Sequence, residues 1–377
     1  MHYLPFARPT LDESMISDVA DTLRSHWIAS GPQVQAFERA LSEYLGGQPV
    51  RVMTSATAAM EVAFDIIGLQ PGDEVITSAM TFFSVGNMIH RSGAKTVFVD
   101  CDLVTRNLDL DQVERAITPR TKAIVPTHFS GLACDMDRLM GIAARANIRV
   151  VEDAALAIGS SWRGRKIGAF GDMATFSFHP NKNMTTIEGG ALVCATEAEA
   201  RRAEVLRFHG IQRLADGTRD IVDAGGKFNM SDVSARLGLA QLSRLDEWCA
   251  RRRKLAAAYF DHLEPVAEAR GIVLPARAHA DDPAGHSWNM FCVLLPLSRM
   301  QGSRKDFMAA MHERGIGIGV SYEAMHLTTL FRGLGHREGE HPNAERIARE
   351  TVTLPLFPTM TEADVARVCE NLLQLID

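Results

Sequence analysis

The feature of this chain that most constrains its fold is an alternation of short apolar runs and helical patterns between Val50 and about Thr196. Most of the apolar runs are rich in Val, Ile, Thr and Phe and are bounded by Gly, Pro, Asp or Ser, which is typical of strands. The runs are VRVMTSA, DEVITSA, KTVFVDCD, KAIVPTHF, IRVVEDAA, ATFSFHP and GGALVCA. Stretches with helical spacing, such as AAMEVAFDIIGL, separate several of them. Strands that alternate with helices predict βαβ units and a largely parallel, buried sheet.

The character of the chain changes after Ser231. A long helical pattern without strands runs from there to about Leu263, and one strand-like run (MFCVLLPL), a helical pattern in RKDFMAAMHERG and a final helix from Thr361 follow. A chain of 377 residues exceeds what one core usually supports. We therefore predict a large domain over residues 1–250 and a smaller α+β domain over residues 251–377, and leave open that the N-terminal segment packs on the smaller one.

Charge and cysteine usage exclude several classes of protein. A net charge of −6 argues against binding the phosphate backbone of nucleic acids, and the only dense basic run, ARRRK from Ala250 to Lys254, is interpreted as a solvated helix face. The six cysteines form no C-x-x-C pair and the histidines no H-E-x-x-H motif, so we predict no disulfide framework and no metal site. No signal peptide or membrane-length apolar stretch is found, and we expect a cytoplasmic protein.

Ligands of parallel α/β sheets bind outside the carboxyl ends of the strands, so the residues that follow each strand are the candidates for chemistry. In MTSATAAME a strand ends and a helix begins, and the free N–H groups of a helix start can bind an anion. An ordinary helix cap explains the same residues. The four small residues at this point are Ser55, Ala56, Thr57 and Ala58.

Two other strand ends carry ionisable side chains. Asp153 ends an apolar strand, where a carboxylate either caps the next turn or holds a cationic ligand nitrogen. Lys182 lies just past the strand in ATFSFHP, where a lysine is either a surface residue or an amine nucleophile. Together, an anion site, a carboxylate and a lysine at one sheet edge are the three groups that pyridoxal phosphate needs. A glycine fingerprint for NAD or a P-loop is absent.

Longer motifs then indicate a family. FARPTLDE, LRSHWIASGPQVQAFE, TSATAAM, FVDCD, VPTHFSG, VEDAA, FSFHPNKNMTTIEGG, GGKFNMSDVSARLGLAQLSRLD, RGIGIGVSY and TLPLFP together span almost the whole chain. They resemble the motifs of the DegT/StrS family of sugar-nucleotide aminotransferases, including members that make UDP-linked 4-amino-4-deoxy-arabinose. The resemblance implies an aspartate-aminotransferase-like (type I) fold, with a mostly parallel mixed sheet flanked by helices and a smaller C-terminal α+β domain. It also implies pyridoxal 5'-phosphate as cofactor, pyridoxamine phosphate as intermediate, and a homodimer with shared active sites.

The resemblance also implies roles for individual residues. Lys182 matches the Schiff-base lysine and Asp153 the partner of the pyridinium nitrogen, while Thr57, Ala58 and Ser177 match phosphate-binding positions. The other matches are Phe82 for a ring stacked on the cofactor, Asn229 for a residue that reaches the partner subunit's phosphate, and Trp27, His179, Tyr322 and His326 as candidate substrate residues.

Two positions depart from the family pattern. Leu156 stands where members usually have His or Gln near the phenolic oxygen of the cofactor, and its side chain makes no hydrogen bond. Ser321 stands where many members have His. The implied reaction moves an amino group from an amino acid, L-glutamate first, to a keto sugar on a nucleotide. The departures leave open an acceptor that is not a sugar nucleotide, such as a keto-cyclitol.

Two further alternatives belong to the same family. A pyridoxamine-dependent sugar dehydratase carries histidine in place of the lysine, so Lys182 speaks against it. A regulator that binds the cofactor without catalysis would normally have a DNA-binding module, and no helix-turn-helix extension or basic face is recognised.

Overall fold

A computed structural model describes residues 3–376. Its centre is a seven-stranded sheet in the order β1-β9-β8-β5-β4-β2-β3. The strands are β1 (Val50–Met53), β2 (Glu74–Ser78), β3 (Lys95–Val99), β4 (Thr121–Val125), β5 (Arg149–Asp153), β8 (Met173–Ser177) and β9 (Gly190–Val193). Only β9 runs against its neighbours, and the β8–β5–β4–β2–β3 pairs are all parallel. The predicted mostly parallel mixed sheet and its seven strands are confirmed.

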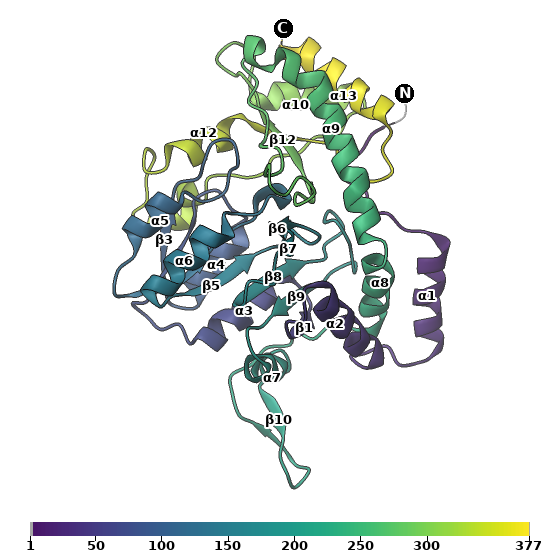
Figure 1. Ribbon diagram of the computed structural model, residues 1–377, viewed down its shortest axis with the longest axis vertical. Helices are drawn as coiled ribbons and strands as arrows, with labels where there is room; N and C mark the ends of the chain where they lie inside the picture. The colour runs from purple at the N-terminus through teal and green to yellow at the C-terminus, as the bar shows by residue number, and fades with distance from the viewer. Residues whose placement is uncertain (1–2, 377) are drawn as a thin grey trace.

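Helices cover both faces of this sheet (Figure 1). On one face, α2 (Pro32–Tyr44), α5 (Leu110–Ala116) and α6 (Met136–Ala146) bury apolar side chains such as Phe37 and Leu139. On the other face, α3 (Ala56–Ile67), α4 (Phe83–Arg91) and α7 (Glu197–Leu206) do the same. Strand side chains alternate between the two faces, so both sides of each central strand are apolar. The core therefore leaves the strand ends as the place for polar chemistry.

The C-terminal part forms a second apolar core, at the top of Figure 1. It contains α9 (Leu245–Arg270), β12 (Phe291–Leu294), α10 (Arg304–Glu313), β13 (Thr351–Leu354) and α13 (Glu362–Ile376). The N-terminal segment joins it, because Leu4 pairs with Ile316 and packs in this core. Since α9 crosses residue 250 without interruption, the division into domains at that point stays a proposal.

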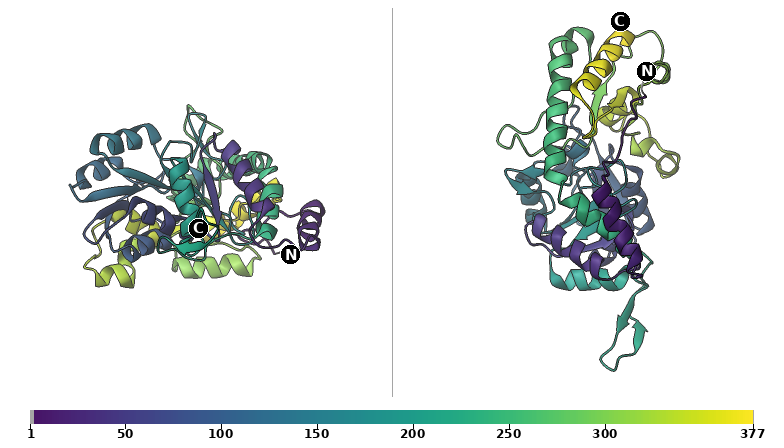
Figure 2. Two further views of the ribbon diagram at one scale, coloured as in Figure 1. Left: turned by 90° about the horizontal axis from the view of Figure 1, so that it is seen from below. Right: turned by 90° about the vertical axis from the view of Figure 1, so that its right-hand side faces the viewer.

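The structure corrects some details of the C-terminal part. The pattern read as one long helix is two helices, α8 (Asp232–Leu242) and α9, because the chain turns at Ser243 and Arg244. The strand β13 was missed, although its TVTL pairs antiparallel with β12. Two short hairpins were also missed, β6 (Ser161–Trp162) with β7 (Arg165–Lys166) and β10 (Ile211–Arg213) with β11 (Arg219–Ile221). The second hairpin projects from the body of the molecule (Figures 1 and 2).

The remaining helices complete the chain: α1 (Glu13–Arg24), η1 (Phe129–Gly131), η2 (Met325–Leu327), α11 (Thr329–Gly333) and α12 (Pro342–Glu350). The α1 helix packs on α8 at the outside of the molecule (Figure 2).

The basic run on α9 is not a uniformly solvated face. Arg252 is only 4% exposed, and its Nη1 donates to the carbonyl oxygens of Trp288 (3.3 Å), Asn289 (3.3 Å) and Leu356 (2.7 Å). Its neighbour Lys254 is exposed, as expected for such a run. The interpretation of ARRRK was therefore wrong for Arg252, because helical periodicity turns one residue of the run towards the core.

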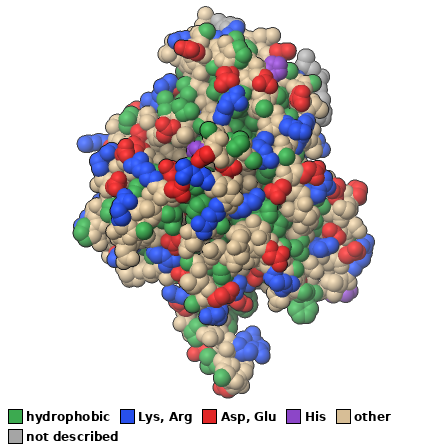
Figure 3. All heavy atoms as spheres, viewed as in Figure 1, with side chains coloured by type: hydrophobic (Ala, Val, Ile, Leu, Met, Phe, Trp, Pro, Cys, Tyr) green, Lys and Arg blue, Asp and Glu red, His purple; other side chains and the backbone are tan. Residues whose placement is uncertain are grey.

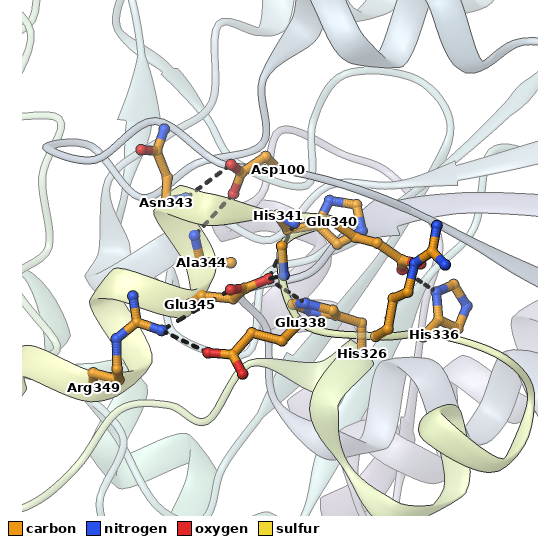
Figure 4. A network of polar contacts seen from close by, with 12 residues as sticks. Asp100, His326, His336, Glu338, Glu340, His341, Asn343, Ala344, Glu345 and Arg349 are labelled. Carbon is orange, nitrogen blue, oxygen red and sulfur yellow. Dashed lines mark hydrogen bonds and ion pairs between the residues drawn. The ribbon is translucent and has the colours of Figure 1, made fainter.

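A polar network joins the large sheet to the C-terminal part (Figure 4). The Asp100 carboxylate, just after β3, accepts hydrogen bonds from the N–H groups of Asn343 (2.9 Å) and Ala344 (2.8 Å) at the start of α12. Beside it, His326 Nε2 lies 3.0 Å from Glu345 Oε1, and both side chains are buried. The helix start thus receives an acidic cap from the other part of the chain, which fixes the two parts against each other.

Acidic and basic side chains are interspersed over the face shown in Figure 3. No helix in residues 3–376 is long and apolar enough to cross a membrane.

Candidate active site

The candidate site is a cavity of about 290 Å³ at the carboxyl ends of β5 and β8. Asp153 pairs with Thr175 in the parallel register of these two strands, so both strands end at the same edge of the sheet. Most of the residues predicted from the sequence line this cavity. They are Ser55, Ala56, Thr57, Phe82, Asp153, Ser177, His179, Lys182 and Tyr322.

The Asp153 carboxylate is buried among neutral donors. The N–H of Ala155 donates to Oδ1 (3.2 Å), and the hydroxyls of Thr127 (3.3 Å) and Thr81 (3.5 Å) donate to Oδ2. Burial raises the pKa of Asp153, while the Ala155 N–H and the charge of Lys182 act in the opposite direction. A buried carboxylate without a direct ion pair is costly, and a cationic ligand nitrogen would relieve that cost.

The loop between β8 and β9 carries Lys182 into the cavity. The N–H of Lys182 donates to the carbonyl of His179 (2.9 Å) in a tight turn, and the side chain is partly buried. Burial lowers the pKa of Lys182 to about 8, and the charge of Asp153 opposes this shift. A larger fraction of the amine is therefore uncharged near neutral pH than in an exposed lysine, which is what a nucleophile or proton carrier requires.

The start of α3 provides the anion site. Ser55 is the N-cap residue, and its Oγ accepts from the N–H of Ala58 (3.0 Å). The N–H groups of Ala56 and Thr57 have no protein acceptor among the described residues. A Cβ on Gly190 would lie 2.3 Å from the Ala56 nitrogen, so only glycine lets β9 pass this close to the helix start. Two free donors, the helix dipole and the Ser177 hydroxyl can together hold a phosphate.

This donor set fits pyridoxal phosphate. The cavity offers two free N–H groups and hydroxyls for a phosphate, a buried carboxylate for a protonated ring nitrogen, and an amine of lowered pKa for an aldehyde. These three requirements belong to different parts of one cofactor.

Aromatic side chains border the same cavity. Phe82 is 49% exposed, and its ring centroid lies 5.6 Å from that of Tyr322 in an edge-on arrangement. The aliphatic side chain of Leu156 also lines the cavity. Ser321 does not line this cavity. Its Oγ accepts from the Thr353 hydroxyl (3.0 Å), and the residue lines a second, smaller cavity.

Four predicted residues do not line this cavity. The N–H of Ala58 is the capped donor of α3, and Trp27 is 60% exposed before α2. Asn229 pairs with Met53, and its Nδ2 donates to Ser30 Oγ (2.6 Å). His326 is fully buried against Glu345 in the network of Figure 4. The structure therefore does not bring His326 to the site, because its ring belongs to the junction between the two parts of the chain.

Several residues of the site were missed. Thr127 follows β4 and Thr81 follows β2, so the search of strand ends that found Asp153 could have found both. Ser84, Met60 and Glu188 also line the cavity. Glu188 lies within the FSFHPNKNMTTIEGG motif, but a single exposed carboxylate in a turn carries no signal of its own.

The fold and the cavity define an α/β enzyme of the type I pyridoxal-phosphate class, and comparisons with known proteins identify the family. Residues 9–373 match the model of the DegT/DnrJ/EryC1/StrS aminotransferase family. The chain belongs to this family and is a PLP-dependent aminotransferase.

Three relatives illustrate the match. The spore coat polysaccharide biosynthesis protein SpsC of Bacillus subtilis is 36% identical over 385 residues, which cover 100% of this chain and 97% of SpsC. Spr1654 of Streptococcus pneumoniae, a proposed sugar aminotransferase solved in PLP and PMP forms, matches the PLP form with a TM-score of 0.91, 31% identity and coverage of 100% and 99%. The structure of 3-amino-5-hydroxybenzoic acid synthase matches with a TM-score of 0.89, 30% identity and coverage of 99% and 98%.

Proposed function

We propose that this chain transfers the amino group of an amino acid, L-glutamate first, to the carbonyl carbon of a keto sugar carried on a nucleotide. The amino acid leaves as its 2-oxo acid, and the carbonyl oxygen of the sugar is replaced by the amino group. The observation that carries the proposal is the meeting of Lys182, Asp153 and the start of α3 in one cavity. SpsC, named for polysaccharide biosynthesis, and Spr1654 support a sugar acceptor.

Pyridoxal phosphate supplies an electron sink for the electrons released when the Cα–H bond of the amino acid breaks. We assign its phosphate to the N–H groups of Ala56 and Thr57 and the Ser177 hydroxyl, with Ser55 ordering the helix start. Asp153 would hold the ring nitrogen in its protonated form, and Phe82, which lines the same cavity, would be the residue to pack against the ring.

Lys182 has two roles in the proposal. Its uncharged amine would hold the cofactor through the aldehyde carbon, with loss of water, and the freed amine would accept the proton from the Cα of the amino donor. A lowered pKa suits both roles, because the amine must accept a proton near neutral pH and then release it. Thr127 and Thr81 orient Asp153 through their hydroxyls.

We also propose a homodimer in which each subunit completes the partner's site. Lys182 is the one Lys or Arg side chain that lines the cavity in the described part of the chain, although the phosphates of a cofactor and a sugar nucleotide need several positive groups. Apolar side chains are exposed beside the cavity, with Phe82 49% and Ile187 59% exposed. A partner surface that covers these side chains and brings basic groups would meet both needs.

A second candidate acceptor is a carbonyl compound without a nucleotide. The departures from the family pattern at Leu156, which lines the cavity, and at Ser321 leave it open. The similarity to 3-amino-5-hydroxybenzoic acid synthase, whose name refers to a compound other than a sugar, supports this candidate. A site that retains Lys182 gives the dehydratase alternative no support, and the regulator alternative has none from a sequence in which no helix-turn-helix extension or basic face is recognised.

The test is the visible spectrum of the cofactor-loaded enzyme before and after L-glutamate, with Lys182→Ala as control. We expect the absorption of the aldehyde form to bleach and 2-oxoglutarate to appear in wild type alone. The aminated enzyme is then offered a UDP-linked keto-arabinose, other keto-sugar nucleotides and a free keto-cyclitol. Recovery of the absorption with a sugar nucleotide alone supports the main proposal, and recovery with the cyclitol alone replaces it by the second candidate. Enzyme that binds the cofactor but converts no amino donor would contradict both.

A further inference from the structure

One buried side chain from the C-terminal part of the chain holds the loop of Lys182 on both sides. The Nδ2 group of Asn289 donates to the carbonyl oxygen of Asn181 (3.3 Å) and to Oδ1 of Asn183 (3.1 Å). These are the residues immediately before and after Lys182. Both hydrogens of the Asn289 amide are thereby used.

Asn183 passes this connection on to two further segments. Its Nδ2 donates to the carbonyl of Ser287 (3.1 Å) and contacts that of Ile158 (3.4 Å), and the residue is 4% exposed. Ile158 lies after β5, the strand that ends in Asp153. The two asparagines therefore link the Lys182 loop to the segment that follows β5 and Asp153.

Asn289 is itself held firmly. Its N–H donates to the carbonyl of Ser130 (2.9 Å), and its own carbonyl accepts from the buried guanidinium of Arg252 (3.3 Å). Its side chain is 5% exposed. Asn181, Lys182 and Asn289 also share the lining of a second cavity of about 120 Å³, so the amide lies beside the lysine. The main chain of Asn289 is thus bonded to Ser130 and to Arg252 of α9, so its side chain holds the loop in a fixed place relative to both.

We propose that Asn289, acting through Asn183, is a positioning residue that sets the direction in which the Lys182 amine enters the site. The proposal rests on the proposed role of Lys182 as the amine that binds the cofactor. Asn289 is neutral, so it places the amine without adding a charge. Without it the carbonyl of Asn181 and Oδ1 of Asn183 would lose a buried partner, and the turn could relax. A shift of about 1 Å in a reacting group costs a large factor in rate.

The competing explanation is that these bonds merely stabilise the fold. A matched control is Ser160, whose buried hydroxyl lies within hydrogen-bond distance of the Gly131 carbonyl (2.6 Å) and Ser287 Oγ (2.8 Å). It stands in the same buried network, but among the described residues its hydroxyl makes no hydrogen bond to residues 181–183. Ser160→Ala thus removes a comparable polar contact without touching the loop.

The experiment follows the amine itself in full-length, cofactor-free protein. Pyridoxal phosphate is added as the probe, the adduct is fixed with borohydride, and its yield at Lys182 is followed by peptide mass spectrometry from about pH 6 to about pH 11. The variants are Asn289→Leu, which keeps the size but removes both donors, Asn289→Ser, which keeps one donor, and Ser160→Ala. The unfolding midpoint of each variant is measured in parallel.

We expect wild type to react with a half-maximal rate near a pH of about 8. Asn289→Leu should lower the limiting rate constant by about tenfold or more, Asn289→Ser should lower it less, and Ser160→Ala should stay within about twofold of wild type. Equal rate constants for Asn289→Leu and Ser160→Ala, at similar losses of stability, would overturn the inference. If the leucine variant does not fold, the comparison of Asn289→Ser with Ser160→Ala decides in the same way. A wild type that forms no adduct at Lys182 would overturn the proposed function itself.

Discussion

Asp153 and Lys182 reach one cavity from the ends of two neighbouring parallel strands, and each shifts the pKa of the other towards its charged form. Burial disfavours the charged form of both side chains. A bound cation would stabilise the carboxylate, and an aldehyde would react with the uncharged amine.

Replacing Lys182 removes the reacting amine. We expect Lys182→Ala to lower the rate of 2-oxo acid formation from L-glutamate by on the order of 10³-fold, because both the covalent and proton-transfer roles are lost. Product formation measured by coupled assay checks this. Lys254→Ala, an exposed lysine on α9, serves as control. If the Lys182→Ala enzyme keeps about a tenth or more of the wild-type activity, another base moves the proton.

Replacing Asp153 should separate activity from stability. Asp153→Asn keeps the shape but removes the charge that holds the ring nitrogen protonated, and we expect a loss of kcat on the order of 10²-fold. Because burial raises the pKa of Asp153, the folded state loses stability as the pH rises above the ordinary carboxyl value of 3.8, and the loss is complete above the raised pKa. The cofactor-free variant should therefore have a higher unfolding midpoint than wild type at pH 7. An equal or lower midpoint would mean that the hydrogen bonds from Ala155 and Thr127 stabilise the carboxylate by more than its burial destabilises it.

Lys182 makes the stability of the cofactor-free protein depend on pH. Its pKa is lowered from 10.5 to about 8, so between these values the unfolded chain binds a proton that the folded chain does not. Its contribution is therefore unfavourable below about pH 8 and becomes less so as the pH rises to 10.5. We expect Lys182→Met to be more stable than wild type at pH 7, with the difference shrinking towards pH 10.5. Urea unfolding across this range measures it, and a difference independent of pH would refute the lowered pKa.

Arg252 should matter for stability although it belongs to a basic run. Arg252→Met would leave the carbonyls of Trp288, Asn289 and Leu356 without their shared donor, and we expect a loss of about 3 kcal/mol in the free energy of unfolding. The exposed Lys254→Met should change it by less than about 0.5 kcal/mol. Denaturant melts of both variants test the difference. Similar melts would mean that water replaces the guanidinium.

The seven strands of the large sheet could be predicted because each is a short apolar run bounded by Gly, Pro, Asp or Ser, and that pattern depends on local composition. The short β13 and the break at Ser243 were missed because neither is marked by the local composition. TVTL becomes a strand through pairing with β12, and the α8–α9 boundary has no proline or glycine to mark it. Similarly, nothing local in ARRRK tells which arginine faces the core.

For the site, the sequence by itself determined the residue types, since Asp153, Lys182 and the small residues after β1 each stand at the end of a strand. Only the tertiary structure decided which strand ends meet. It brings Thr127 and Thr81 to Asp153 and Asn289 to the loop of Lys182, and it directs His326 into the junction with Glu345. The physical reason is that hydrogen-bond partners more than a hundred residues apart, such as Asn289 and Asn181, are chosen by how the two cores pack, and no local pattern encodes that choice.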